Sequence, residues 1–213
     1  MKTRAYQLST MQIDDFTLAG YSVAGEESVI LAPELDCAFD IGKCPREALK
    51  INHVLLTHGH MDHVAGSLGY ALIDVRQKLK EEYLGLTGPQ IVELKNRGVQ
   101  ITQRLEMPLV AYLGDTARGR FADLPYVANA KALLIECTFF DPDHVSRARA
   151  GKHIHVSDLP AVLEGMNNQH IIITHVTRRT NMTEARQLLR KALPHDVMDR
   201  VSFLMSRKFI EEQ

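Results

Sequence analysis

The stretch that most constrains this chain is Thr57 to Gly66, which reads T-H-G-H-M-D-H-V-A-G. Three histidines and one aspartate occur within six positions, in the spacing H-x-H-x-D-H. Neutral imidazole and carboxylate groups are the usual protein ligands of zinc and related divalent ions. The preceding residues, His53 to Leu56, form an apolar run of strand character. The pattern therefore predicts a metal-binding loop at the end of a strand.

The four polar residues of this loop divide into two pairs. Gly59 permits a tight turn, so we expect His58 and His60 to leave the strand end on the same side. Asp62 and His63 follow as the chain turns toward a helix, and they can reach a second point nearby. Two interleaved pairs of ligands suit a dinuclear site. The alternative, four polar residues on a solvated loop, is disfavoured by the specific spacing and by further candidate ligands downstream.

Apolar strands that lead into polar residues recur along the chain, and the residues with ligand chemistry that follow them are His58, Asp115, Glu136 and His175. Sites in α/β proteins gather where strands end, because the loops converge there while the sheet holds them rigid. The pattern favours one active site over four unrelated surface residues.

The local sequence predicts short strands and three helices. Strands are expected at residues 5–8, 16–19, 28–31, 37–40, 53–56, 70–75, 109–113, 132–135 and 171–174, with a charged, polar stretch at 76–83. One helix is expected to open at Gly88-Pro89. Ser157 is a plausible N-cap for a second helix that runs through Met166. Asn181 with Glu184 indicates the start of a third helix over residues 182–192.

Composition indicates an ordinary globular protein. The 213 residues are 45% hydrophobic and 24% charged, enough for one sizeable domain with a real core. The net charge of −1 means that any nucleic-acid binding must use local basic patches. Three cysteines, an odd number, favour reduced thiols over a disulfide framework. We found no signal-peptide pattern or long apolar span, so we expect a cytoplasmic protein without membrane contact.

The H-x-H-x-D-H loop after an apolar strand resembles the signature of the metallo-β-lactamase superfamily. Six further stretches resemble the short form of tRNase Z (ribonuclease Z), the endonuclease that trims precursor-tRNA 3′ ends: F-D-I-G-K-C-P at Phe39–Pro45, K-L-K-E-E-Y-L-G-L-T-G at Lys78–Gly88, L-G-D-T at Leu113–Thr116, E-C-T-F at Glu136–Phe139, G-K-H-I-H at Gly151–His155 and T-H-V-T-R-R at Thr174–Arg179. The resemblance implies an α/β fold, the metallo-β-lactamase αββα sandwich, as a single domain over residues 1–213. It also implies zinc-dependent cleavage of precursor-tRNA 3′ trailers and a homodimer.

The resemblance assigns metal ligands. It implies that His58 and His60 bind the first of two zinc ions, and that Asp62, His63 and His175 bind the second. Asp115 is the expected bridge, because the two oxygens of a carboxylate can each bind one metal.

The resemblance also implies catalytic residues. They are Asp62, Glu136 and His153, with Glu136 orienting His153 as proton donor to the departing sugar oxygen. His153 matches the first histidine of the family's G-H-I-H pattern, so His155 is expected to support the loop. Arg179 matches an arginine that follows the last ligand.

One departure from the family lies in the middle of the chain. The family has another metal-binding histidine before the G-D-T aspartate, but residues 64–114 contain no histidine. His63 alone matches two family positions, as though the chain were spliced between them. We therefore expect the second site to bind its metal ion and the first site to bind its ion more weakly. Either the fold is truncated in the middle or a segment is missing from the sequence; we favour the missing segment, which a chain break within Val64–Tyr70 would reveal.

Several functional alternatives remain at this level. The chain could be another hydrolase of this fold that acts on a small ester or nucleotide, or a non-catalytic relative that binds RNA or a protein partner. Gly88-Pro89 resembles part of the arm with which the family grips tRNA. Basic residues flank the expected site, and they are either phosphate contacts or merely solvated: Arg118, Arg120, Arg147, Arg149, Lys152, Arg178 and Arg179.

Overall fold

The structure, a computed structural model, describes residues 5–25, 27–42, 44–57, 69–177, 180–204 and 208–210. The metal-loop residues His58, His60, Asp62 and His63 lie outside these ranges, as does Arg179. Most of the junction at Val64–Tyr70 also lies outside them, so the expected chain break is not tested. In the described ranges, no helix has the length and apolar character that a membrane crossing requires.

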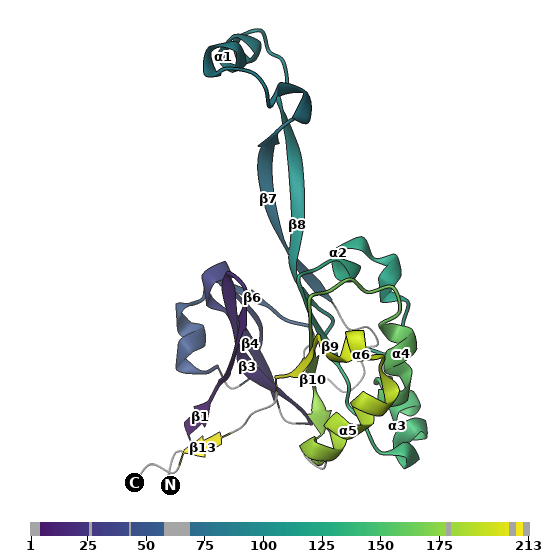
Figure 1. The fold of residues 1–213 in the computed structure, drawn as a ribbon. Coiled ribbons are helices and arrows are strands. Elements are labelled where there is room, and N and C mark those ends of the chain that lie inside the picture. Colours follow the sequence, from purple (N-terminus) through teal and green to yellow (C-terminus); the bar gives the residue numbers. More distant parts are fainter. Residues whose placement is uncertain are drawn as a thin grey trace.

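The described residues form two large sheets that pack face to face, with helices on the outer side of one of them (Figure 1). A separate two-stranded sheet pairs residues 5–7 with residues 208–210. The strands are β1 (Ala5–Gln7), β2 (Ser9–Ile13), β3 (Phe16–Ala24), β4 (Glu27–Ala32), β5 (Cys37–Ile41), β6 (His53–Leu55), β7 (Tyr70–Leu79), β8 (Thr102–Tyr112), β9 (Ala132–Glu136), β10 (His170–Thr174), β11 (Val176–Thr177), β12 (Val201–Phe203) and β13 (Lys208–Ile210). The α-helices are α1 (Gly88–Asn96), α2 (Pro125–Ala128), α3 (Val145–Ala150), α4 (Leu159–Val162), α5 (Met182–Ala192) and α6 (His195–Met198). This arrangement confirms the expected α/β class.

One sheet has the order β12-β10-β9-β8-β7, in which β8, β9, β10 and β12 are parallel. The other has the order β11-β3-β4-β5-β6, with β2 paired to β3. Because the chain direction of β8, β9 and β10 is shared, their carboxyl ends open at the same edge. The residues that follow these strands are therefore brought together.

Successive side chains of the central strands point to opposite faces of the sheet, one toward the helices and one toward the other sheet. In β9, Leu133 and Ile135 pack with residues of helices α2 to α5, whereas Leu134 faces the other sheet. In β10, Ile172 joins Leu134 between the sheets. All four side chains are fully buried. Burial of both faces explains why these strands read as continuous apolar runs in the sequence.

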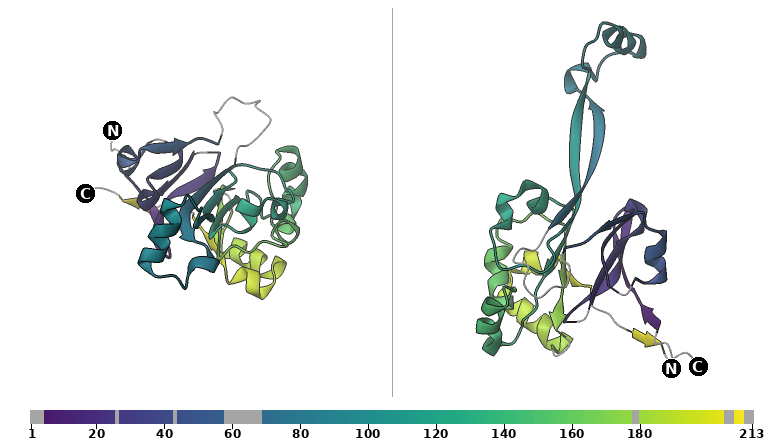
Figure 2. Two further views of the ribbon diagram at one scale, coloured as in Figure 1. Left: turned by 90° about the horizontal axis from the view of Figure 1, so that it is seen from above. Right: turned by 180° about the vertical axis from the view of Figure 1, so that it is seen from behind.

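A long hairpin projects from the body of the molecule. Strands β7 and β8 pair antiparallel from Tyr70↔Tyr112 to Leu79↔Thr102, and α1 lies at the tip (Figures 1 and 2). We call this hairpin with α1, residues 70–112, the arm. The polar stretch after Val75 continues the strand, so the expectation that the strand ends there is wrong. In the outer half of the arm, residues 75–78 and 103–105 are exposed whichever face they are on, and pairing with β8 sets the length of β7.

The predicted helix from Ser157 through Met166 is wrong at both ends. The imidazole of His155 is the N-cap: its Nδ1 accepts a hydrogen bond from the Ser157 backbone N–H at 3.1 Å. A 3₁₀ turn, Val156–Asp158, then leads into α4, which ends at Val162. By contrast, α5 has the predicted bounds. Asn181 caps it by accepting from the backbone N–H groups of Thr183 and Glu184.

The thiols agree with the expectation from cysteine number. Cys37 and Cys137 are buried, Cys44 is exposed, and all three are free. Burial in the core raises the pKa of the Cys137 thiol well above its ordinary value.

Candidate metal and active site

Three of the four polar residues expected after strands meet at the carboxyl ends of β8, β9 and β10. Asp115 follows β8, Glu136 ends β9, and His175 follows β10. The Asp115 Oδ2 atom lies 3.2 Å from Nε2 of His175. Glu136 Oε1 accepts a hydrogen bond from the backbone N–H of Thr116, next to Asp115, at 3.2 Å. The fourth, His58, is outside the described residues.

Glu136 is a fully buried carboxylate whose oxygens are held by five donors. Oε2 accepts from the backbone N–H and the hydroxyl of Thr138, at 3.0 and 2.7 Å. Oε1 accepts from Nδ1 of His153 at 2.8 Å and from the backbone N–H groups of Thr116 and Ile154. A buried charge is tolerated where such bonds replace water. Glu136 is thus a fixed anchor that cannot itself leave the core.

The contact predicted between Glu136 and His153 is present, and it fixes the imidazole. Because Nδ1 faces the carboxylate, it carries the proton, and Nε2 is left for other chemistry. This hydrogen bond raises the pKa of His153 above its ordinary value, while partial burial opposes the rise. His155 has a different role: its Nε2 lies 3.0 Å from the Asp141 carbonyl oxygen, and its Nδ1 caps the 3₁₀ turn. His155 therefore connects Asp141 with the start of the 3₁₀ turn.

His175 is positioned by residues far from it in sequence. Its backbone has φ +55°, the left-handed region, and its N–H donates to the Ser22 hydroxyl at 3.0 Å. The side-chain Nδ1 lies 2.8 Å from Oγ1 of Thr138, which also bonds to Glu136. One threonine hydroxyl thus links the carboxylate to this second imidazole, and Nε2 of His175 is directed at Asp115.

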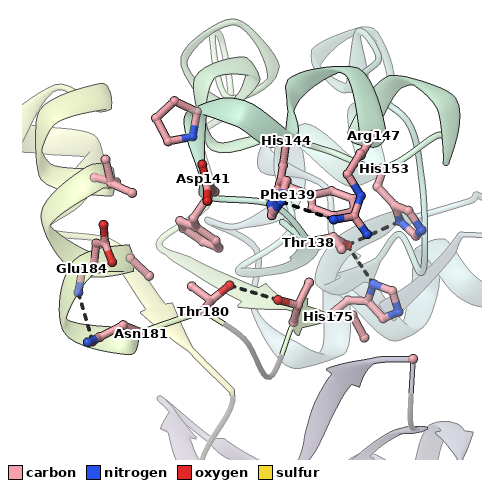
Figure 3. A pocket seen from close by; sticks show the side chains of 17 residues that line it. Thr138, Phe139, Asp141, His144, Arg147, His153, His175, Thr180, Asn181 and Glu184 are labelled. Carbon is pink, nitrogen blue, oxygen red and sulfur yellow. Dashed lines mark hydrogen bonds between the residues drawn. The ribbon is translucent and has the colours of Figure 1, made fainter.

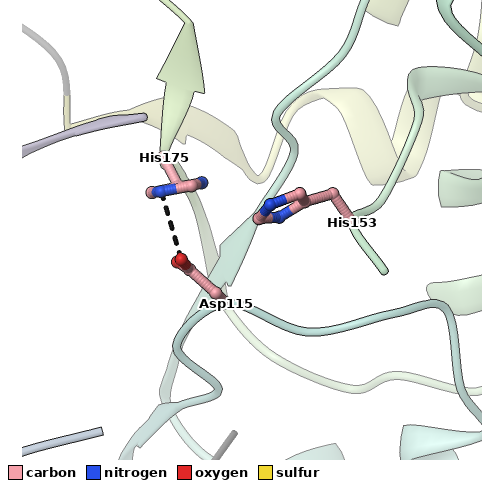
Figure 4. A group of neighbouring side chains, drawn as sticks. All are labelled: Asp115, His153 and His175. Atoms are coloured by element: carbon pink, nitrogen blue, oxygen red, sulfur yellow. Dashed lines mark ion pairs between the residues drawn. The ribbon is translucent and has the colours of Figure 1, made fainter. Parts of the chain in front are cut away.

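Asp115, His153 and His175 form a group that could hold a metal ion (Figure 4). One ligand atom from each lies within 4.8 Å of the others. Imidazole and carboxylate, as in His175 and Asp115, are donors that zinc accepts, and a hydrogen bond to the second ring nitrogen, here between His175 and Thr138, typically orients such a ligand. The residues present therefore fit a metal ion. The expected ligand His175 and the expected bridge Asp115 lie together, with His153 beside them.

Asp40 organises the start of the metal loop through contacts that the sequence did not reveal. Its carboxylate accepts from the Thr57 backbone N–H at 2.9 Å, the Thr57 hydroxyl at 2.7 Å and the Tyr112 hydroxyl at 2.9 Å. Burial and the nearby Asp40 charge raise the pKa of Tyr112 well above its ordinary value, so its phenol remains a donor. These bonds join β5, β8 and the residue before His58.

Gly114 permits the close approach of β8 to this network. It has φ +59°, and an added Cβ would lie 2.9 Å from Cβ and Cγ2 of Thr57. We expect Gly114→Ala to lower the free energy of unfolding by about 2–4 kcal/mol, from backbone strain plus the clash. Gly98→Ala is the matched control, with φ +73° and no atom within 4 Å, and should cost about 1–2 kcal/mol. If urea unfolding showed equal losses of stability for Gly114→Ala and Gly98→Ala, the clash with Thr57 would not contribute.

A cleft of about 620 Å³ opens beside the metal-binding group (Figure 3). Thr138, His153 and His175 lie at one end, and Asn181 and Glu184 of α5 lie at the other. Sequence reasoning did not single out Thr138 or Ser22. The alternation of Glu136 and Thr138 along the chain is a weak signal that both face one side, whereas no local signal connects Ser22 with His175.

The stacked sheets, with the group Asp115, His153 and His175 at their edge, have the metallo-β-lactamase fold. Among solved structures, the metallo-beta-lactamase fold protein YhfI from Bacillus subtilis superposes with a TM-score of 0.51 at 12% sequence identity. The match covers 88% of this chain and 95% of that one. No family model matches the chain.

Sequence comparison finds two similar tRNase Z proteins. The chain is 28% identical to tRNase Z TRZ1 of Arabidopsis thaliana, over 93% of this chain and 98% of that protein. It is 25% identical to tRNase Z TRZ2, chloroplastic, of the same species, over 85% and 73%. The chain is therefore similar to tRNase Z proteins over most of its length.

The alignment with TRZ1 also bears on the shortened middle of the chain. It extends over 276 positions but covers 93% of the 213 residues, about 198, so about 78 positions (276 − 198) have no counterpart here. TRZ1 thus contains internal residues that this chain lacks, in agreement with the missing histidine.

Proposed function

We propose that the chain is a zinc-dependent endoribonuclease that cleaves precursor tRNA at its 3′ trailer. The observation that carries this proposal is the arm. Its strand β8 runs from the tip into the body and ends at Tyr112, three residues before Asp115, so the arm leads straight into the metal-binding group. A small ester or a mononucleotide is too small to contact the arm and the metal-binding group together, whereas a folded RNA can contact both.

The reach and charge of the arm support an RNA substrate. Eleven residues of β8 at about 3.3 Å per residue span roughly 36 Å, although the last three pair with β9 in the body. Lys78, Lys95 and Arg97 are exposed on the arm, and none has an acidic partner within 4.0 Å in the part of the chain described. Such unpaired cations supply phosphate contacts.

The residues at the body end have distinct roles in the proposed reaction. Glu136 holds His153 with Nε2 directed away from the core, and His153 donates a proton to the departing sugar oxygen. The raised pKa of His153 keeps more of it protonated near neutral pH. Asp115 and His175, with ligands from the loop His58–His63, would hold zinc, which supplies an activated water and stabilises developing charge.

A homodimer in the cytoplasm completes the proposal. Analytical ultracentrifugation of the purified protein tests the oligomeric state. A monomer would contradict the proposed dimer but would leave the proposed catalytic activity unaffected.

The test of function is cleavage of a precursor tRNA, set beside hydrolysis of bis(p-nitrophenyl) phosphate. We expect 3′-trailer cleavage that is lost with a chelator and restored by zinc, and between one and two equivalents of metal per chain by elemental analysis. Hydrolysis of the small diester without RNA cleavage would favour a small-substrate enzyme. Binding of RNA without either reaction would indicate a non-catalytic relative.

A further inference from the structure

Arg147 differs from the other arginines near the site. Arg118 and Arg149 share the buried carboxylate of Asp158, at 3.6 and 3.4 Å, and Arg120 pairs with Asp123. Arg147 has no carboxylate partner within 4.0 Å among the residues that the structure describes. It extends from α3 into the cleft beside the metal-binding group (Figure 3).

Two neutral groups hold the guanidinium of Arg147 in place. Its central carbon lies over the Phe139 ring, 5.9 Å from the centroid. Its Nη1 lies 3.3 Å from Nε2 of His144. Because a guanidinium can only donate, Nε2 of His144 is the acceptor in this hydrogen bond. The Arg147 charge is therefore oriented without being neutralised, which is the arrangement an anion-binding residue requires.

The oriented charge lies close to the metal-binding group. The Phe139 ring that carries Arg147 also packs edge-on against the His153 ring, with centroids 6.1 Å apart. His153 in turn stacks on His175 at 5.2 Å. An anion on Arg147 would thus be a near neighbour of a phosphate held at the metal-binding group.

The rest of the cleft has the size and chemistry of a nucleoside site. Its volume of about 620 Å³ is within the range of roughly 300–1,000 Å³ that small ligands occupy. Leu188 gives it apolar surface above the buried Phe140 and Ala185, while Asp141 and Glu184 lie away from Arg147. Carboxylates there disfavour a second phosphate but can accept hydrogen bonds from a ribose or a base.

We propose that this cleft is a nucleotide subsite, in which Arg147 binds the phosphate next to the scissile one and the cleft takes the attached nucleoside. This inference rests on the proposed function, because it places a neighbouring nucleotide of the same RNA. Phe139 and His144 are positioning residues that hold the guanidinium. The fork of Arg147 matches two phosphate oxygens, a geometry that the point charge of a lysine lacks.

Kinetics with matched arginine variants test the subsite in the zinc-loaded protein. Arg147→Ala should raise KM for precursor tRNA about tenfold or more, the loss of one charge-assisted contact, with kcat little changed. Arg147→Lys should recover only part of the loss. Arg149→Ala removes the same charge from the same helix, but Arg149 is paired with Asp158 and should have little effect. Equal effects of the two alanine variants would overturn the subsite in favour of general electrostatics.

Binding of adenosine 5′-monophosphate, measured by calorimetry beside adenosine, separates this inference from the proposed function. We expect Arg147→Ala to weaken the nucleotide about tenfold and adenosine not at all. If the nucleotide shows this pattern but wild-type protein does not cleave RNA, the subsite stands and the proposed function fails. If RNA is cleaved but Arg147→Ala binds the nucleotide as wild type does, the subsite is wrong.

Discussion

Replacing His153 by alanine is expected to lower the rate of precursor-tRNA cleavage by about 10²–10⁴-fold, the usual contribution of a positioned proton donor. The expectation rests on the hydrogen bond of 2.8 Å from Nδ1 to the buried Glu136, which leaves Nε2 for proton transfer. Metal content should stay near that of the wild type, because we assign the ligand role to Asp115 and His175. Single-turnover cleavage and elemental analysis of the same preparation provide both measurements.

His155 supplies the control for this variant, because it lies two residues away and faces the core. His155→Ala should reduce stability by about 1–3 kcal/mol through the loss of a helix cap and a buried hydrogen bond. Its folded fraction should cleave RNA far better than His153→Ala. Loss of metal in His153→Ala would contradict the proton-donor role and would make His153 a ligand, since it lies within the metal-binding group.

Removing the arm is expected to lower kcat/KM for precursor tRNA by about 100-fold or more while leaving hydrolysis of bis(p-nitrophenyl) phosphate unchanged. Arg76 pairs with Leu105, so residues 77–104 can be replaced by an Asn-Gly turn without changing the register. The body should still fold, because the residues of β7 and β8 that pack in the core all lie outside the deleted range. They are Tyr70 and Leu72 of β7, and Leu109, Val110 and Tyr112 of β8. The loss reflects missing phosphate contacts, whose free energy adds across the arm.

A salt series distinguishes an electrostatic grip from loss of fold. Binding of precursor tRNA by the intact protein should weaken steeply between low and moderate salt. Alanine at Lys78, Lys95 and Arg97 together should flatten the slope of log affinity against log salt concentration. Full RNA cleavage by the armless protein, or binding that does not depend on salt, would show that the arm does not grip the substrate.

Local sequence was sufficient where the governing interactions are themselves local. Strands β9 and β10 are apolar throughout because both faces are buried, so their composition predicts them. Helix α5 begins where Asn181 can cap it, and capping involves only the next three residues. The contact between Glu136 and His153 was implied by resemblance to tRNase Z, whose motifs E-C-T-F and G-K-H-I-H keep their order here. The α/β class follows from the same apolar strands.

Tertiary structure alone decided features that depend on partners distant in sequence. The strands of the arm extend through polar residues because β7 and β8 pair with each other. Where a strand is exposed on both faces, its sequence has no alternation of polar and apolar residues from which the strand could be predicted. His175 takes a left-handed backbone conformation that is held by Ser22, 153 residues away. Asp40 bonds to Thr57 and Tyr112, 17 and 72 residues away, and no local pattern predicts those partners. In the sequence, Arg147 and Arg149 are equivalent charges. Only the fold pairs Arg149 with Asp158 and places Arg147 in the cleft.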